Sequence, residues 1–207
     1  MIKEVIDKFY VAKQAKDKEK TAFWISDAGK CPRSIWFSMK GYPKKQLDAK
    51  TMRIFEHGEH THMRIMAVLF SLGLVKACEI EIPETEMIHG RADAIISKAN
   101  ELYVIEVKSV NSVKFRKDQP DSDHVKQIQL YMHFFKINKG ILVYENKDTQ
   151  EIKEFLVELD EDLINELLSS FADLKRHIDS ASIPEIPKDL ERWRCEYCTY
   201  ADECRKM

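Results

Sequence analysis

The sequence lacks any apolar segment long enough to span a membrane. Its longest uninterrupted apolar run, residues 65–70, is far shorter than the roughly 20 residues that a membrane-spanning helix needs. The N-terminal segment MIKEVIDKFY is charged and amphipathic, with neither a continuous apolar stretch nor a small-residue cleavage site. We therefore expect no signal peptide, a cytoplasmic location and no membrane partner.

The sequence also has few glycines and prolines and a net charge close to zero. Six Gly and six Pro among 207 residues are too few for a collagen-like or low-complexity chain, and no Ser/Gly linker or internal repeat divides the sequence. The content of 44% hydrophobic and 33% charged residues predicts one globular domain over residues 1–207, with its core at about residues 50–160. A formal net charge of −2 excludes nucleic-acid binding by bulk charge alone, so such binding would need a local patch.

Cysteine is present in an odd number. The chain has five, which argues against a disulfide framework in a cytosolic protein. Cys195, Cys198 and Cys204 follow one another near the C-terminus with the spacing Cys-x2-Cys-x5-Cys, which is typical of metal ligands. A fourth ligand would have to come from elsewhere, and Cys31 is the candidate. Cys78 lies in an alternating apolar segment and is expected to be a small buried hydrophobic residue.

The order of the hydrophobic patterns predicts an α/β domain. Helical spacing occurs over residues 2–16, 49–72, 123–135 and 160–180, with a further short helix after Cys31. Apolar or alternating segments predict strands over residues 78–82, 90–96, 102–107, 140–144 and 152–159. Residues 98–101 are the turn of a hairpin between the second and third strands. This order predicts a mixed β-sheet with helices on its faces.

The third predicted strand places an acid and a lysine on the same face. Glu106 and Lys108 are two residues apart, so both side chains point away from the side of the strand that faces the core. Asp93 lies on the partner strand, within reach across the hairpin. Two converging carboxylates can hold Mg²⁺ or Mn²⁺, and an adjacent lysine can assist phosphodiester hydrolysis. The alternative is an exposed, salt-bridged hairpin, in which Glu-x-Lys occurs by chance.

Two helices add further polar pairs in a fixed order along the chain. His62 follows Gly58 by four residues, and Tyr131 follows Gln127 by four residues just after the hairpin. This order resembles the RecB-like branch of the PD-(D/E)XK nucleases, although Ala92 replaces the family's proline. The resemblance covers about residues 26–204, and the matching positions are Gly58-xxx-His62, Gly90-Arg-Ala-Asp93, Glu106-Val-Lys108 and Gln127-xxx-Tyr131.

The resemblance implies a PD-(D/E)XK restriction-endonuclease-like core and a role for each matching residue. Asp93 and Glu106 would bind Mg²⁺ or Mn²⁺, with His62 as a further metal ligand or a substrate contact. Lys108 would assist the attacking water. Gln127 and Tyr131 would position the active site and the scissile strand. The implied catalytic set is therefore Asp93, Glu106, Lys108, Gln127 and Tyr131.

Several neighbouring polar residues have a simpler interpretation. His57 and His60 compete with His62 for its role, but both are expected on an exposed helix face. Glu79 and Glu81 could add a water-mediated metal contact, although a solvated edge strand is the favoured interpretation. Gln129 is expected to lie on a different face of its helix from the candidate site and to tolerate alanine.

The cysteines extend the resemblance. One N-terminal cysteine, followed by Pro32-Arg33, and three C-terminal ones flank the core as in the iron–sulfur nucleases, which include the AddB-type helicase-nucleases and the CRISPR-associated RecB-like exonucleases (the fourth Cas family). This implies a [4Fe–4S] cluster that joins segments of about residues 26–40 and 190–207. Its ligands would be Cys31, Cys195, Cys198 and Cys204. Zinc is the alternative, although zinc ribbons usually use two Cys-x2-Cys pairs and this chain has one.

These resemblances together imply a metal-dependent DNA exonuclease that acts on single-stranded ends. Its partners would be a CRISPR integrase complex in spacer acquisition, or recombination and DNA-processing proteins. Lys114, Arg116 and Lys117, just after the hairpin, are candidate phosphate contacts. The alternatives are a non-catalytic iron–sulfur module for nucleic-acid binding or redox chemistry, and a zinc-stapled adaptor that recruits a partner through the Lys-rich N-terminal helix.

Overall fold

The computed structural model describes residues 1–14 and 20–207. Contacts divide the chain into two compact units. The first unit comprises Met1–Phe23, Lys30–Glu56 and Ser169–Met207, and the second comprises Trp24–Gly29 and His57–Leu168. Among the described residues, none of the helices combines the length and the apolar character that crossing a membrane requires.

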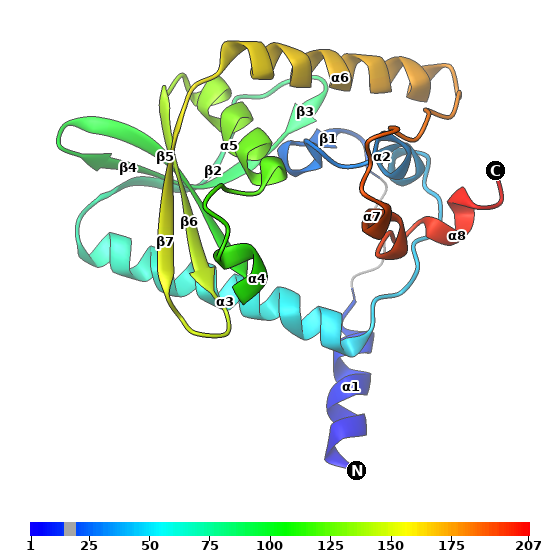
Figure 1. The fold of residues 1–207 in the computed structure, drawn as a ribbon, viewed down its shortest axis with the longest axis horizontal. Coiled ribbons are helices and arrows are strands. Elements are labelled where there is room, and N and C mark those ends of the chain that lie inside the picture. The colour runs from blue at the N-terminus through cyan, green and yellow to red at the C-terminus, as the bar shows by residue number, and fades with distance from the viewer. Residues whose placement is uncertain (15–19) are drawn as a thin grey trace. The chain divides into compact units, whose positions relative to one another are not determined.

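The second unit is built on a five-stranded mixed sheet (Figure 1). In spatial order its strands are β2 (Val75–Glu81), β4 (Arg91–Lys98), β5 (Glu101–Val110), β6 (Lys139–Asn146) and β7 (Ile152–Glu158). Strands β5 and β6 are parallel, whereas the other neighbours are antiparallel. The chain therefore crosses over between β5 and β6, and helix α5 (Ser122–Phe135) lies in this crossover. The mixed α/β fold and the β4–β5 hairpin are confirmed.

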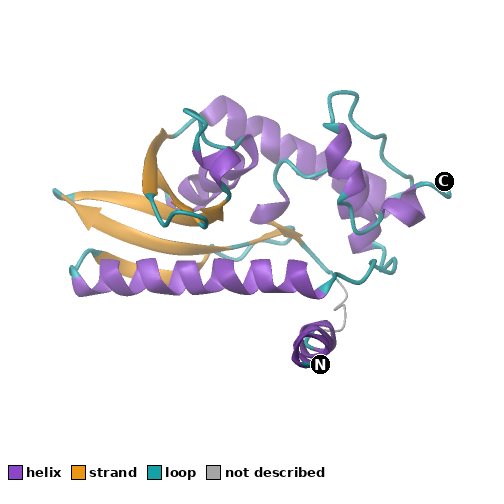
Figure 2. Cartoon of the chain, turned by 60° about the horizontal axis from the view of Figure 1, so that its bottom comes forward, coloured by secondary structure: helices purple, strands orange, loops and turns teal. Residues whose placement is uncertain are grey.

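One face of the sheet is covered by α3 (Ala49–Ser71), which ends before Gly73 in a left-handed conformation at φ +68°. Figure 2 shows this helix running along the strands. Apolar side chains of α3 pack directly against β4 and β5, and the shared core consists of Ile65, Met66, Ala94, Ile96, Ile105 and Val107. Glu106 lies between Ile105 and Val107 on β5, so its side chain points to the opposite face of the sheet, away from α3.

Helix α5 covers the opposite face of the sheet and approaches it closely at β6. A Cβ atom on Gly140 would lie 2.6 Å from Met132 Sδ and 2.7 Å from Ile128 Cδ1, so a larger residue would force these side chains to shift. The helix begins after Asp121, whose side chain accepts a hydrogen bond from the Asp123 amide. At Gln127 the helix contacts β5, where the predicted acid and lysine are located.

Smaller elements complete the second unit. They are the 3₁₀ helix η1 (Ile25–Asp27), the short strand β3 (Ile88–His89) and the helix α4 (Ser112–Phe115), which was not expected from the sequence. Asn111 caps α4 by accepting a hydrogen bond from the Lys114 amide. Helix α6 (Glu161–Asp179) begins in this unit and continues into the first.

The first unit gathers the N- and C-terminal segments. Its elements are α1 (Ile2–Ala12), the beginning of β1 (Phe23–Trp24), α2 (Pro32–Met39), α7 (Arg192–Glu196) and α8 (Ala201–Cys204), with parts of α3 and α6. Phe37 is fully buried and stacks on Tyr200 with ring centroids 5.8 Å apart. Arg33 Nε donates to the Pro184 carbonyl at 2.9 Å. These contacts hold α2, which follows Cys31, against the C-terminal tail.

Helix α1 is amphipathic, as expected, but none of its residues is buried. Its polar side contacts the beginning of α3, where Arg53 Nη1 donates to Asp7 at 2.7 Å and the Tyr10 hydroxyl donates to Glu56. The helix was expected over residues 2–16 and ends at Ala12; residues 15–16 lie outside the described residues.

Candidate active site

The candidate site lies where the β4–β5 hairpin opens. The main-chain pairing of the two strands extends only to Ala94 and Ile105. Just beyond it, Asp93 Oδ2 accepts a hydrogen bond of 2.7 Å from the Val107 amide, so a carboxylate occupies the place of a main-chain carbonyl. Burial raises the pKa of Asp93 to about 6, against the lowering effects of this hydrogen bond and of the Lys108 charge.

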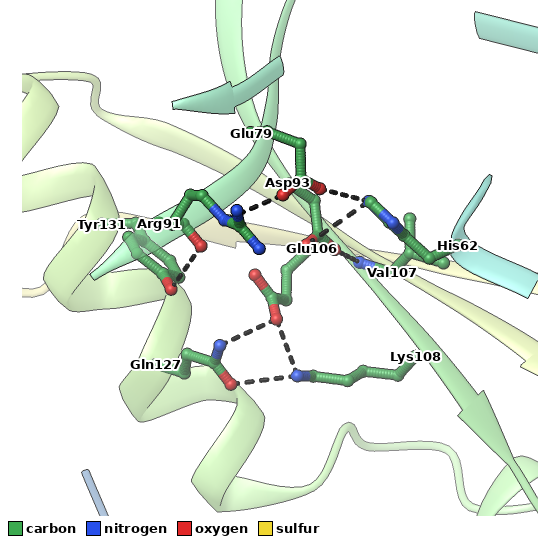
Figure 3. Close-up of polar contacts among 9 residues, drawn as sticks. All are labelled: His62, Glu79, Arg91, Asp93, Glu106, Val107, Lys108, Gln127 and Tyr131. Atoms are coloured by element: carbon green, nitrogen blue, oxygen red, sulfur yellow. Dashed lines mark hydrogen bonds and ion pairs between the residues drawn. The ribbon is translucent and has the colours of Figure 1, made fainter. Parts of the chain in front are cut away.

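Glu106, Lys108 and Gln127 form a closed set of hydrogen bonds on the α5 side of the sheet (Figure 3). Lys108 Nζ donates to Glu106 Oε1 at 2.7 Å and to Gln127 Oε1 at 3.0 Å. Gln127 Nε2 donates to the same Glu106 oxygen at 2.8 Å. Glu106 is only 3% exposed, which excludes the alternative of a solvated, salt-bridged hairpin. The structure thus brings Gln127 together with the acid and the lysine.

The second oxygen of Glu106 has no hydrogen-bond partner among residues 1–14 and 20–207. Oε1 accepts both hydrogen bonds described above, whereas Oε2 is buried and is not hydrogen-bonded by any described residue. Burial raises the pKa of Glu106 to about 7, the Asp93 charge acts in the same direction, and the Lys108 charge opposes them. An unsatisfied buried acceptor costs about 1–3 kcal/mol, so this oxygen indicates a site for a bound group.

A second buried atom that lacks a hydrogen bond from the described residues belongs to His62, on α3. Its Nε2 lies 3.5 Å from Asp93 Oδ1 and 3.5 Å from Glu79 Oε1, and within the described part of the chain nothing satisfies it. His57 and His60 are exposed, as expected. Of the three histidines considered for this role, the structure therefore brings His62 to the carboxylates.

Glu79 is the residue whose role the sequence interpretation underestimated. Its side chain is 43% exposed on edge strand β2, but its carboxylate approaches His62 and also binds Arg91 Nε at 2.8 Å. Cys78 and Ile80, on either side of Glu79, pair with Ala94 and Ala92, so Glu79 lies opposite Asp93. The pairing of β2 with β4 brings the two carboxylates together, and no short sequence pattern predicts the register of that pairing.

These side chains fit a divalent cation. His62, Glu79 and Asp93 each offer one ligand atom, and these atoms lie within 4.8 Å of one another. Glu106 adds a buried, unpartnered oxygen at the same end of the hairpin. Carboxylate oxygens and one imidazole nitrogen are suitable ligands for Mg²⁺ or Mn²⁺. A cation held by His62, Glu79 and Asp93 would satisfy the orphaned Nε2 of His62.

Tyr131 lies on the same side of α5 as Gln127, as expected, but contacts the main chain. Its hydroxyl donates to the Arg91 carbonyl at 2.8 Å, and its side chain is 3% exposed. Burial raises the pKa of Tyr131, so the hydroxyl stays protonated and remains a donor. This bond anchors β4 two residues before Asp93.

Gln129 is buried and makes two hydrogen bonds to the main chain. Only 2% of the residue is exposed; its Nε2 donates to the Glu158 carbonyl at 2.7 Å, and its Oε1 accepts from the Asp160 amide at 3.0 Å. It therefore joins the end of β7 to the beginning of α6. These contacts argue against the expectation that position 129 tolerates alanine, because the buried side chain has two specific partners.

The candidate cluster cysteines all belong to the first unit. Burial raises the pKa of Cys198, and Cys31, Cys204 and Cys195 raise it further through their charges. The Tyr200 amide donates to Cys198 Sγ at 3.4 Å, and Arg33 Nη1 donates to Cys204 Sγ at 3.8 Å. Among the described residues, no three of these thiols lie within 4.8 Å of one another.

Cys78 differs from these four cysteines in its environment. It lies on β2 at the edge of the sheet and is exposed, so the expectation of a buried hydrophobic residue is wrong. An edge strand leaves part of its surface in solvent, which the alternating sequence pattern does not reveal.

Known proteins share this chain's sequence pattern and fold. A model of the PD-(D/E)XK nuclease superfamily matches residues 6–205. The CRISPR-associated exonuclease Cas4 of Saccharolobus solfataricus is 28% identical over 194 residues, covering 90% of this chain and 89% of that protein. The crystal structure of SSO0001 is 25% identical and matches with a TM-score of 0.61, covering 99% of this chain and 96% of that one.

A more distant structure shares the fold alone. The alkaline exonuclease LHK-Exo from Laribacter hongkongensis is 13% identical and matches with a TM-score of 0.60, covering 84% of this chain and 93% of that one. The family match, by contrast, spans nearly the whole chain. The chain therefore belongs to the PD-(D/E)XK nuclease superfamily.

Proposed function

We propose that this chain is a divalent-metal-dependent DNA exonuclease that acts on single-stranded ends. The observation that carries the proposal is the buried Glu106 carboxylate, which binds Lys108 through one oxygen and leaves the other without a partner. One carboxylate thus joins a candidate cation site to a fixed ammonium group. A bound cation and an ammonium group can both stabilise the negative charge that develops on the phosphate during phosphodiester hydrolysis.

His62, Asp93 and Glu106 are the proposed ligands for Mg²⁺ or Mn²⁺, and Glu79 is a further carboxylate at the same place. When bound, the cation would supply Lewis acidity toward the scissile phosphate and promote ionisation of an attacking water. The Val107 amide holds Asp93 in its orientation. The position of this one ligand is thus set by the hairpin main chain before a cation binds.

Lys108 is the proposed catalytic cation of the chain itself. Its Nζ is held 2.7 Å from Glu106 and 3.0 Å from Gln127, which leaves one of its three N–H bonds for water or a phosphate oxygen. The Gln127 amide fixes this geometry because its oxygen faces the lysine and its nitrogen faces the glutamate. Tyr131 acts further away, by holding β4 through the Arg91 carbonyl.

The proposed substrate follows from the relatives and from local charge. The matched relative from S. solfataricus is a CRISPR-associated exonuclease, and one LHK-Exo structure contains dAMP. Arg116 and Lys117 follow α4, close in sequence to the catalytic strand, and are candidate phosphate contacts, whereas Lys114 is engaged by Asp121 at 2.7 Å. A CRISPR integrase complex, or recombination and DNA-processing proteins, are the proposed partners.

The test is degradation of end-labelled single-stranded DNA in Mn²⁺ or Mg²⁺. We expect Asp93→Ala and Glu106→Ala each to slow cleavage by at least about 10²-fold, since each removes charge stabilisation in the transition state. Glu81→Ala is the matched control, because Glu81 is an exposed glutamate on the same edge strand as Glu79 and should retain full activity. Cleavage that persists in Asp93→Ala would refute the proposed active site.

We also propose that Cys31, Cys195, Cys198 and Cys204 hold a [4Fe–4S] cluster. The mutual effect of their charges on Cys198, and the N–H donors from Tyr200 and Arg33 to two sulfurs, support a shared thiolate site. Zinc is the alternative occupant of the same four thiolates.

Metal analysis of anaerobically purified protein tests the cluster. We expect about four iron atoms per chain, with Cys31→Ala losing iron and stability while the exposed control Cys78→Ala keeps both. Stoichiometric zinc in place of iron, or loss of iron in Cys78→Ala, would refute the ligand set. The proposed catalytic residues lie in the second unit and the four cysteines lie in the first, so each proposal can be refuted without the other.

A further inference from the structure

His124 lies beside the candidate active site but has no part in the proposed metal site. It precedes Gln127 by three residues on α5, so the two side chains lie on the same side of the helix. Its hydrogen-bond partner, Tyr144, is aligned with Lys108 in the parallel register of β5 and β6. The His124–Tyr144 pair is therefore one strand away from the catalytic lysine.

The hydrogen bonds of Tyr144 fix the tautomer of His124. Tyr144 is 1% exposed, and its hydroxyl oxygen accepts the Asp121 amide at 3.0 Å. The phenolic proton then needs an acceptor, and His124 Nδ1, 2.5 Å away, is the acceptor that the structure provides. Nδ1 is thus unprotonated, so a neutral imidazole carries its proton on Nε2.

The Nε2–H group is left available. In the described structure no protein group accepts from it, and it is not among the buried atoms that lack a partner, so it reaches solvent. The ring itself is held edge-to-face against Tyr144, with centroids 5.4 Å apart. A directed N–H donor is therefore fixed in place by α5, β6 and the turn at Asp121.

The surroundings keep this histidine neutral. Burial lowers the pKa of His124 to about 4, and Lys108 and Lys114 act in the same direction, while Asp121 opposes them. Asp121 is itself engaged by Lys114 at 2.7 Å. The two lysines attract an anion to this place, and the imidazole can offer it a hydrogen bond without adding charge.

We propose that His124 Nε2–H donates a hydrogen bond to a backbone phosphate of the bound DNA strand, next to the phosphate that Lys108 faces. This assignment rests on the proposed function and names one contact of its substrate. A neutral donor of fixed direction would position the strand, whereas the lysines supply attraction that depends on salt.

Two substitutions separate the two nitrogen positions of the ring. In His124→Gln the side-chain amide reaches the position of Nε2, whereas in His124→Asn it reaches only that of Nδ1. We measure binding of a short fluorescent single-stranded oligonucleotide by anisotropy, with Ca²⁺ in place of Mg²⁺. We expect His124→Asn to bind about ten-fold more weakly and His124→Gln to stay within about three-fold of the parent, as for one hydrogen bond to a charged group.

The salt dependence gives a readout that a merely structural role would not produce. Loss of a neutral contact should leave the slope of log K against log salt unchanged, whereas Lys117→Ala should reduce it by about one phosphate contact. Melting temperature and Mn²⁺ affinity should be unaltered in His124→Asn. His133→Asn is the control, because His133 lies nine residues further along α5, on its opposite side.

The outcomes distinguish this inference from the proposed function. If the parent protein binds no DNA, the proposed function fails. If the parent binds DNA and His124→Asn binds equally well, the phosphate contact is refuted while the nuclease proposal stands. If both His124 variants weaken binding equally and lower the melting temperature, the residue only supports Tyr144, and the inference is also refuted.

Discussion

Binding of Mn²⁺ at the candidate site should weaken steeply as the pH falls from 8 to 6. A cation needs Asp93 and Glu106 in their ionised forms, but burial raises the pKa values of these two carboxyls to about 6 and about 7. Protons therefore compete with the cation within an ordinary working range of pH. The effect is largest at Glu106, the more deeply buried of the two.

The size of the effect follows from the two pKa values. At pH 6, Glu106 is ionised in roughly one molecule in eleven and Asp93 in about half, whereas at pH 8 both are almost fully ionised. Because both carboxyls must be ionised, the dissociation constant for Mn²⁺ rises by roughly ten-fold or more between pH 8 and pH 6.

Isothermal titration calorimetry measures this directly. Titrations in buffers of different ionisation enthalpy should show release of roughly one proton or more per Mn²⁺ at pH 6 and about 0.1 at pH 8. In Glu106→Gln the pH dependence should fall to about two-fold, because Asp93 alone remains. Equal affinity at both pH values, without proton release, would show that the carboxyls are already ionised in the free protein and would refute the reasoning.

The same shifts have a consequence for folding. Both carboxyls bind protons more tightly in the folded chain than in the unfolded one, so their contribution favours the folded state at low pH. This contribution is lost as the pH rises from about 4, near the unfolded values, to about 7. The metal-free protein should therefore gain more from added Mn²⁺ at pH 8 than at pH 6, measured as a rise in melting temperature.

Three further predictions follow from individual contacts. Gln127→Ala should slow DNA cleavage by about 10²-fold while calorimetry shows little change in Mn²⁺ affinity, because Gln127 holds Lys108 and Oε1 of Glu106, whereas the Glu106 oxygen offered to the cation is Oε2; an unchanged rate would remove it from the site. Gln129→Ala should lower the free energy of unfolding by about 1–3 kcal/mol in urea denaturation, since a buried side chain and its two hydrogen bonds to the main chain are lost; no loss would mean that water replaces it. Glu79→Gln should weaken Mn²⁺ binding several-fold, and equal affinity would leave only the other ligands.

The fold and most of the site could be predicted from the sequence because their determinants are local. The β4–β5 hairpin follows from two apolar segments and a polar turn, and strand alternation alone places Glu106 and Lys108 on one face. Four-residue spacing likewise places Gln127 and Tyr131 on one side of α5. The order of the motifs along the chain then identified the family.

What could not be predicted depends on pairing between distant segments. The position of Glu79 depends on the register of β2 against β4, and the exposure of Cys78 depends on β2 being an edge strand. The partners of Gln129 lie about thirty residues further along the chain. The role of His124 depends on Tyr144, which the parallel β5–β6 register brings beside Lys108. None of these registers is encoded in a short motif.

The main chain at Glu79 adopts φ +48°, a left-handed conformation that costs a non-glycine residue about 1 kcal/mol or more. Glycine or asparagine at this position would relieve that cost. A selection for thermal tolerance alone should therefore enrich Glu79→Gly and Glu79→Asn, whereas a selection for DNA degradation at limiting Mn²⁺ should eliminate them. Position 79 would thus separate variants that survive heating from variants that work, and a thermostabilised form of this nuclease should be sought at other positions.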